Sequence, residues 1–325
     1  MLNKRVNYTS FKTIVTKMTC VMSILPNVLP PLVCKKLPIE LLIILSNFIR
    51  FKPRNKAELQ DAVDMWCENR KEAIKEYGHI SGWDTSMITD MSGLFKDKKK
   101  FNDDISEWDT RNVTYMKGMF CKAHIFNQPI GLWDTRNVTD MSGMFCEAHS
   151  FNQPIGDWNT SNVTDLNLMF RNAYAFNQPI GGWDTSSVTN MEDMFCNAKN
   201  FNQPIGGWDT NNVNNMMCMF CGTHSFNQPI EGWNVIQVKD MSYMFCEAYA
   251  FNQPIRGWDT RNVTNMERMF FNAHTFNQCI EGWNVRSVKD KSEMFYYADK
   301  LTKRPDWYYL SRQQFIATLK SCLVI

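Results

Sequence analysis

Thiol side chains are the first residues of this sequence that could do chemistry. Cys218 and Cys221 form a C-x-x-C pair, a spacing found in zinc sites and in proteins that exchange disulfides. No second cysteine pair and no H-x-x-H motif completes a set of four zinc ligands. We therefore expect neither a metal site nor a redox site at this pair.

Five of the eleven cysteines share one position of a repeated segment. They are Cys121, Cys146, Cys196, Cys221 and Cys246. Arg171, Phe271 and Tyr296 fill the same position elsewhere, which indicates a tolerant, half-buried site rather than a ligand. We expect reduced thiols, and they favour an intracellular protein over a surface-displayed one. Disulfides between neighbouring segments are the alternative.

Histidines form a second recurring row, which contains His124, His149, His224 and His274. His124 and His149 lie in consecutive segments, so their rings could pair around a metal ion. Tyrosine, lysine and aspartate fill the same place in other segments, which favours a variable, solvent-facing position over a metal ladder. The sequence also lacks G-x-x-x-x-G-K-[ST], H-E-x-x-H and G-x-S-x-G motifs. We expect no catalytic residue, no cofactor and no bound metal, and hence a protein that is not an enzyme.

The element that must position these side chains is a repeat of 25 residues. Nine tryptophans recur at this interval without an insertion: Trp83, Trp108, Trp133, Trp158, Trp183, Trp208, Trp233, Trp258 and Trp283. The neighbouring residues recur with them, since FNQPIGGWDT at 201–210 matches FNQPIGDWNT at 151–160. A segment this short cannot bury its own apolar side chains. Neighbouring repeats must therefore stack around a continuous core, as in a solenoid.

Within one repeat, the pattern predicts a helix, a strand and a turn. The apolar residues with helical spacing are Met141, Met144, Phe145 and Ala148. They predict about two helical turns over 140–148. Pro154 then ends helical geometry, and the segment 155–158 is the expected parallel strand. The Asp or Asn after each tryptophan, with the threonine that follows it, is expected to start a turn.

A row of asparagines recurs as strictly as the tryptophans. It comprises Asn127, Asn152, Asn177, Asn202, Asn227, Asn252 and Asn277. A polar residue this regular is expected to bond backbone groups left open at the turn of the adjacent coil. A binding face lined by asparagine is the alternative.

The complete unit, F-N-x-x-I-x-x-W-D-T-S-x-V-T-D-M-S-x-M-F-x-x-A, resembles the mycoplasma-lipoprotein-type repeat. That repeat belongs with the BspA-like leucine-rich repeats (LRRs) of bacterial and protist surface proteins, and it also occurs in giant viruses. The resemblance covers about residues 80–300 and implies surface display, adhesion or protein binding without enzymatic activity. Lys291, Cys279 and Leu94 depart from the pattern, which indicates less regular terminal coils.

The periodicity and the resemblance together give the expected fold class. It is an α/β solenoid, an LRR-like right-handed superhelix with one short strand and one short helix in each coil of 25 residues, and with helical caps at both ends. Four regions are expected. They are a poorly ordered N-terminus at 1–36, a helical cap at 37–79, nine coils at 80–300 and a C-terminal cap at 301–325.

The flanks carry three more specific predictions. Asn55 and Glu58 form a capping box that opens a helix over about 56–77, which Gly78 can end. The segment 37–50, LPIELLIILSNFIR, opens like an F-box, which would bind a ubiquitin-ligase adaptor. An amphipathic helix packed on the cap is the alternative. The first 36 residues could include a poor signal peptide, although proline interrupts their apolar part.

Charge and hydropathy exclude two classes of partner. The 325 residues carry a formal net charge of +2, from 35 basic and 33 acidic side chains. This near-balance argues against a nucleic-acid partner, whose binding normally rests on a basic field. No apolar run reaches the ~18–20 residues that a membrane span needs.

These observations favour a repeat protein that binds another, unidentified protein. Recognition is expected to use outward positions that differ between repeats: Leu132, Asp157, Leu168, Asp193, Tyr243, Arg256, Arg268 and Glu281. One alternative is a ubiquitin-ligase substrate adaptor that recruits the ligase through 37–50. The other is a surface-displayed adhesin with glycans at Asn137 or Asn262, since both asparagines lie in N-x-[ST] sequences.

Overall fold

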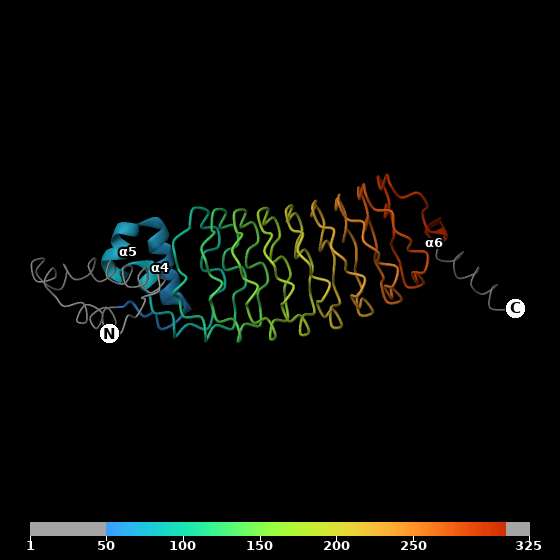
Figure 1. Ribbon diagram of the computed structural model, residues 1–325. Helices are drawn as coiled ribbons and strands as arrows, with labels where there is room; N and C mark the ends of the chain where they lie inside the picture. Colours follow the sequence, from blue (N-terminus) through green and yellow to red (C-terminus); the bar gives the residue numbers. More distant parts are fainter. Residues whose placement is uncertain (1–49, 310–325) are drawn as a thin grey trace, which may run out of the picture. The chain divides into compact units, whose positions relative to one another are not determined.

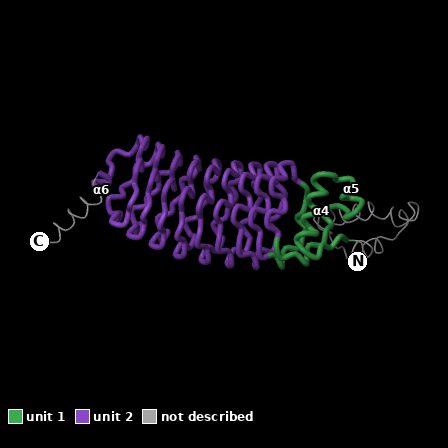
Figure 2. The backbone as a smooth tube through the Cα atoms, turned by 180° about the vertical axis from the view of Figure 1, so that it is seen from behind, with its two compact units in different colours: residues 1–90, 103–113 green, residues 91–102, 114–325 purple. Residues whose placement is uncertain are grey.

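The computed structural model describes residues 50–309. The N-terminal segment 1–36, the F-box-like segment 37–50 apart from its last residue, and the C-terminal cap beyond 309 lie outside the described residues. The chain divides into two compact units (Figure 2). Compact unit 1 combines Met1–Asp90 with Asp103–Val113, and compact unit 2 combines Met91–Asn102 with Thr114–Ile325.

Over residues 56–77, where the sequence predicts one helix, the structure has two. Helix α4 spans Lys56–Glu68 and helix α5 spans Arg70–Tyr77, with a short 3-10 helix, η1, at Ile80–Gly82 (Figure 1). Asn69 separates α4 from α5, because its backbone has left helical geometry and its side chain caps α5 by accepting from the Glu72 N–H. The predicted ends are confirmed: Asn55 caps α4, and Gly78 ends α5 with a φ of 73°.

The helices of compact unit 1 pack against the first tryptophan of the repeats. Leu59, Ala62, Val63 and Trp66 of α4 are buried, as their spacing predicts. The Trp66 ring meets the Trp83 ring edge-on, with 6.1 Å between centroids. The Trp66 indole N–H donates to an Asp103 carboxylate oxygen at 2.9 Å. The start of the first repeat therefore packs against these helices within compact unit 1.

In compact unit 2 the repeats are made of turns rather than of a helix and a strand. Similar coils lie side by side along this unit (Figures 1 and 2). Between residues 83 and 305, which the structure describes without a gap, no helix and no named strand occurs. The helix predicted over 140–148 and the strand predicted over 155–158 are therefore wrong.

Hydrogen bonds explain why the predicted helix does not form. The N–H groups of Gly143, Phe145 and Glu147 donate to carbonyl groups of the next repeat, at 2.7–2.9 Å. The alternate N–H groups close turns inside the repeat, such as Met144 N–H to Met141 C=O at 3.1 Å. An α-helix would need those N–H groups for its own i→i−4 bonds. Here they join one repeat to the next.

The predicted strand is replaced by pairing elsewhere in the repeat. At 155–158 the Trp158 N–H closes a turn on the Ile155 carbonyl at 3.3 Å. Isolated parallel bridges instead join the residue just before the core methionine or leucine, as between Asp140 and Asp165. Such bridges join the equivalent residues of successive repeats, from Tyr115 to Asp290.

The backbone reaches this path through two left-handed positions in each repeat. Gly143 and Glu147 have φ values of 59° and 57°, and the corresponding residues of the other repeats are also left-handed. Glycine adopts such φ values freely, and asparagine and aspartate do so more readily than other residues, yet nine of the eighteen left-handed repeat residues are none of these three. The bonds between repeats therefore hold a backbone that local preference would not choose.

Rows of identical side chains fill the core of compact unit 2. Phe145 stacks on Phe170 with 5.7 Å between centroids and on Phe151 of its own repeat at 3.8 Å. Trp183 and Trp208 stack at 6.4 Å, and both rings are 3% exposed. Each of these indole N–H groups also donates to a buried isoleucine carbonyl of the preceding repeat, as Trp208 does to Ile180 at 3.1 Å.

The asparagine row bonds the backbone, as predicted. The Oδ1 atom of each asparagine accepts the backbone N–H of the corresponding residue one repeat later, at 2.8–3.1 Å. In several repeats the same oxygen also accepts from a glutamine side chain, such as Gln203 on Asn177 at 3.0 Å. The row therefore links successive repeats, and the alternative of a binding face lined by asparagine finds no support in these bonds.

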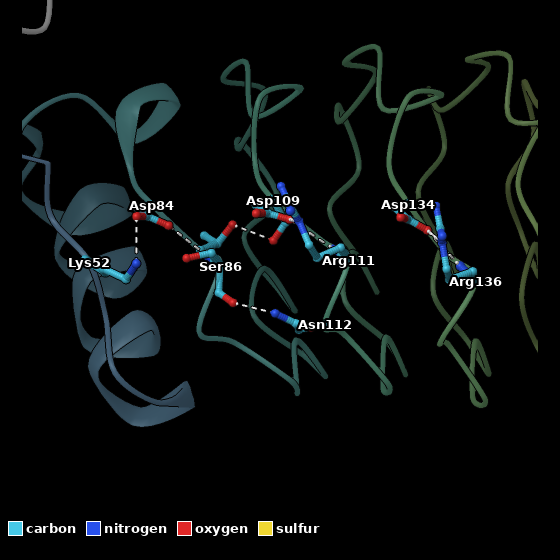
Figure 3. A network of polar contacts seen from close by, with 9 residues as sticks. Lys52, Asp84, Ser86, Asp109, Arg111, Asn112, Asp134 and Arg136 are labelled. Atoms are coloured by element: carbon cyan, nitrogen blue, oxygen red, sulfur yellow. Dashed lines mark hydrogen bonds and ion pairs between the residues drawn. The ribbon is translucent and has the colours of Figure 1, made fainter. Parts of the chain in front are cut away.

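The predicted turn after each tryptophan is also confirmed. Asp84 accepts from the backbone N–H of Ser86 at 3.0 Å, and the Lys52 ammonium lies 3.0 Å from the same carboxylate (Figure 3). In compact unit 2, Asp134 accepts the Arg136 backbone N–H at 3.2 Å and its side-chain Nε–H at 2.9 Å. A short side-chain oxygen that bonds a backbone N–H two residues on is the Asx-turn geometry.

The end of compact unit 2 is less regular, as its sequence departures suggest. Helix α6 spans Asp306–Tyr309, and its buried Trp307 continues the indole row by donating to Ile280 C=O at 3.3 Å. Lys291 occupies a position that methionine or leucine fills in other repeats, and its ammonium donates to the Tyr308 carbonyl. Burial lowers the pKa of this lysine.

Candidate functional site

One row of half-buried and exposed side chains runs along compact unit 2, and we call it the ring ladder. It consists of His124, His149, Tyr174, Lys199, His224, Tyr249, His274 and Asp299. His124 stacks on His149 with 4.4 Å between centroids, and His149 stacks on Tyr174 at 4.6 Å. The Lys199 ammonium lies 5.4 Å from the Tyr174 centroid. The row predicted as variable and solvent-facing thus forms a series of ring contacts.

The second half of the ring ladder contains similar ring contacts in a different order. His224 stacks on Tyr249 at 4.4 Å, and the tilted His274 ring lies 5.3 Å from Tyr249. His274 Nδ1 lies 2.8 Å from an Asp299 carboxylate oxygen. These contacts join members one repeat apart, because the 25-residue period places them at the same point of successive coils.

The surroundings of two ring-ladder histidines, His149 and His224, favour the neutral imidazole. Burial lowers the pKa of His149, and the neighbouring His124 ring lowers it further, while Glu147 opposes the shift. Burial also lowers the pKa of His224, with a further contribution from Lys199. Neutral imidazole nitrogens can accept a hydrogen bond or bind a metal ion.

The cysteine row is half-buried to buried, as its tolerance of other residues suggests. The eight cysteines among residues 50–309 are all free. A hydrogen bond between the Cys121 and Cys146 thiols lowers the pKa of Cys121 to about 7 and raises that of Cys146, which burial raises further. Contacts with Cys196, Cys218 and Cys246 raise the pKa of Cys221. The C-x-x-C pair is thus part of a longer thiol row.

Four of the eight predicted recognition residues are on the surface, as expected. Leu132 is 92% exposed, and Asp157, Arg256 and Glu281 are exposed as well. Leu132 and Asp157 directly precede tryptophan, whereas Arg256 and Glu281 lie one residue earlier in the repeat. The four therefore occupy two neighbouring positions rather than one.

The other four predicted residues project outward less than expected. Leu168, Tyr243 and Arg268 are half-buried, and Asp193 is buried at 7% exposure. The prediction of an outward Asp193 is wrong, because its carboxylate forms an ion pair with Arg171 at 3.4 Å. All four residues have left-handed backbones, with φ between 49° and 58°.

Two of these four residues form a polar cluster across repeats. The Tyr243 hydroxyl donates to a Glu267 carboxylate oxygen at 2.8 Å, and an Arg268 guanidinium N–H donates to the Tyr243 hydroxyl at 3.1 Å. The Arg268 Nε–H donates to Glu293 at 2.7 Å. These contacts fix Tyr243 and Arg268 at the surface of adjacent repeats.

A family profile described as "Mycoplasma protein of unknown function, DUF285" matches four overlapping segments of the chain: 63–179, 126–228, 153–248 and 203–308. Together these matches cover more than half of the chain, and they span both the second half of α4 and the repeats. The chain belongs to the DUF285 family.

The DUF285 assignment confirms the repeat and assigns no function. A sequence search finds no match among curated proteins. Within residues 50–309, no helix of this DUF285 protein has the length and apolar character needed to cross a membrane.

Proposed function

We propose that the repeats of this DUF285 protein form an LRR-like solenoid of the BspA-like type, which binds a protein partner and catalyses no reaction. The observation that carries the proposal is the separation of constant from variable positions. Core residues such as Phe145 and Phe170 recur and are fully buried, whereas outward positions change from Leu132 to Asp157 in consecutive repeats. A stacked array offers such positions over a broad surface, so affinity can come from area without a deep pocket.

The ring ladder supports a protein partner in particular. Its exposed Tyr174 and half-buried Tyr249 are held by stacking, and the Tyr243–Arg268 cluster is held by hydrogen bonds. Tyrosine and arginine are enriched at the energetic centres of protein interfaces. Side chains already held in place lose less entropy when a partner binds.

The test combines crosslinking with matched substitutions. A partner is identified by crosslinking to the full chain and is then titrated against purified variants. We expect Leu132→Ala, Tyr174→Ala or Arg256→Ala to weaken binding, with about 2 kcal/mol at a central residue corresponding to about thirtyfold. Lys239→Ala, at an exposed residue outside these rows, is the matched control. Unchanged affinity in all three variants would refute the proposed surface.

The adaptor and adhesin hypotheses remain predictions from the sequence. The F-box-like segment lies outside the described residues, apart from Arg50. Co-purification with a ligase adaptor, lost on deletion of 37–50, would favour the adaptor. Detection of the glycosylated chain outside cells would favour the adhesin.

A further inference from the structure

Three potential metal ligands meet at the start of the ring ladder. His124 and His149 stack with 4.4 Å between centroids and 18° between planes. Glu147 lies two residues before His149, and its left-handed backbone, with φ 57°, belongs to the path that every repeat adopts. One ligand atom from each of the three side chains lies within 4.8 Å of the other two. All three residues are half-buried, so solvent can reach the cluster.

The donor set selects the kind of ion. Two imidazole nitrogens and one carboxylate oxygen suit Zn²⁺ and similar transition metals, whereas Mg²⁺ and Ca²⁺ prefer sites built of oxygen. Three protein ligands leave one tetrahedral position for water. The nitrogens would have to approach to about 3.4 Å for metal–nitrogen bonds of about 2.0 Å. Since their lone pairs lie in the ring planes, the stacked rings must also tilt towards each other.

The cluster is specific to one pair of repeats. The corresponding residues four repeats later are His224, Glu247 and Tyr249, and the His224 and Tyr249 rings stack in the same way at 4.4 Å and 15°. There, tyrosine replaces the second histidine, so one imidazole ligand is missing. Among residues 50–309, only His124, Glu147 and His149 form a group of three or more such ligands within this distance. The His224, Glu247 and Tyr249 group is therefore an internal comparison, with the same positions in the repeat and one metal ligand fewer.

We propose that His124, Glu147 and His149 bind a divalent transition-metal ion, with zinc the best match to their donor set. The ion would join two consecutive repeats, because His124 comes from one coil and the other two ligands come from the next. A ligand that binds the folded state but not the unfolded state stabilises the fold. The site therefore acts as a clip between coils, and it is independent of the proposed protein-binding function.

Titration of the full chain with Co²⁺ tests the site. The visible spectrum of bound Co²⁺ shows whether its ligands are nitrogen and oxygen atoms or thiolates. We expect about one Co²⁺ per chain, with visible ligand-field bands and no thiolate charge-transfer band, and we expect Zn²⁺ to displace it and raise the unfolding temperature. Loss of an outer-shell partner alone lowers metal affinity about 10–100-fold. His149→Tyr, which removes a ligand, should therefore weaken binding by at least about tenfold.

Two further variants complete the design. His224→Tyr is the matched control, since it changes a stacked histidine outside the cluster and should leave cobalt binding unchanged. Tyr249→His should add a second binding event of the same spectrum. Tyrosine already stacks on histidine at this position of the ladder, so His149→Tyr should fold, and circular dichroism checks this.

Two results would overturn the proposal. One is the absence of saturable Co²⁺ binding to the folded wild-type chain. The other is binding that carries a thiolate band and survives in His149→Tyr, which would assign the metal to the cysteine row instead.

Discussion

Replacing Asn177 by alanine tests the bonds that join the repeats. Asn177 Oδ1 accepts the Asn202 backbone N–H at 3.0 Å and the Gln203 side-chain amide at 3.0 Å. The change removes both of these hydrogen bonds at once and leaves the backbone N–H of the half-buried Asn202 without its partner. An unsatisfied buried donor costs about 1–3 kcal/mol. We therefore expect the free energy of unfolding to fall by about 2 kcal/mol.

Urea unfolding, followed by tryptophan fluorescence, measures the effect of Asn177→Ala. With an m-value of about 3 kcal/mol/M, a loss of 2 kcal/mol shifts the midpoint by about 0.7 M. Asn177→Asp keeps an oxygen acceptor in place and should lose less. Asn200→Ala, at an exposed asparagine of a neighbouring repeat, is the control and should stay within about 0.5 kcal/mol. If Asn177→Ala and Asn200→Ala shift the midpoint equally, the asparagine row does not stabilise the array.

Three further changes address the core and the pH dependence. Trp208→Phe keeps an aromatic ring but loses the indole hydrogen bond to the Ile180 carbonyl, which still accepts from the Trp183 N–H. It should therefore destabilise by about 0.5–1.5 kcal/mol, less than the 3–5 kcal/mol expected of Trp208→Ala, and equal urea midpoints for wild type and Trp208→Phe would contradict this. Burial lowers the pKa of His79, so the stability it contributes is present above about pH 6.5 and is lost as the pH falls towards its folded-state pKa. His79→Asn keeps an acceptor for the Ser81 N–H. It should reduce the change in the urea midpoint between about pH 7.5 and pH 5.5. If the midpoint of the variant changes with pH as much as that of the wild type, His79 is not the source of this pH dependence. Burial raises the pKa of Asp165, so the stability that its protonated carboxyl contributes is lost as the pH rises from about 3.9 through the folded-state pKa. Asp165→Asn should therefore be at least as stable as wild type at pH 7. A lower urea midpoint for the variant at pH 7 would refute the argument.

The sequence predicts the side-chain rows well because strict repetition leaves few ways to bury them. The buried tryptophans, the asparagine bonds and the turn after each tryptophan all follow from residues that recur at one interval. In each case the side chain has one dominant need, either burial of an aromatic ring or a partner for a short polar group. That need does not depend on knowing the backbone path.

The backbone path itself could not be predicted from the spacing. Met141, Met144, Phe145 and Ala148 have the spacing of a helix, yet turns closed by i→i−3 bonds place them equally well in the core. The recurrence of glycine at Gly93, Gly118 and Gly143 was a signal of left-handed geometry. Later repeats obscured it by placing Leu168 or Tyr243 there.

Only part of the candidate site can be predicted from the sequence. Leu132 and Arg256 are exposed as predicted, but Asp193 is buried because Arg171 of the preceding repeat reaches it. The histidine row was visible in the sequence. Tyrosine at this position favours a variable, solvent-facing site when only the sequence is considered, whereas in the structure Tyr174 and Tyr249 extend the row by stacking.

The two left-handed positions of each repeat restrict how such an array can diversify. From residue 93 to residue 297 they hold leucine, aspartate, glutamate, asparagine, cysteine, tyrosine, arginine, lysine and glycine, but no valine, isoleucine, threonine or proline. Side chains branched at Cβ clash in this conformation, and the proline ring cannot adopt it at all. Substitutions at these two positions are therefore limited by the backbone conformation, whatever partner the protein binds. Residues that are not branched at Cβ, proline excepted, remain available to each copy of the repeat.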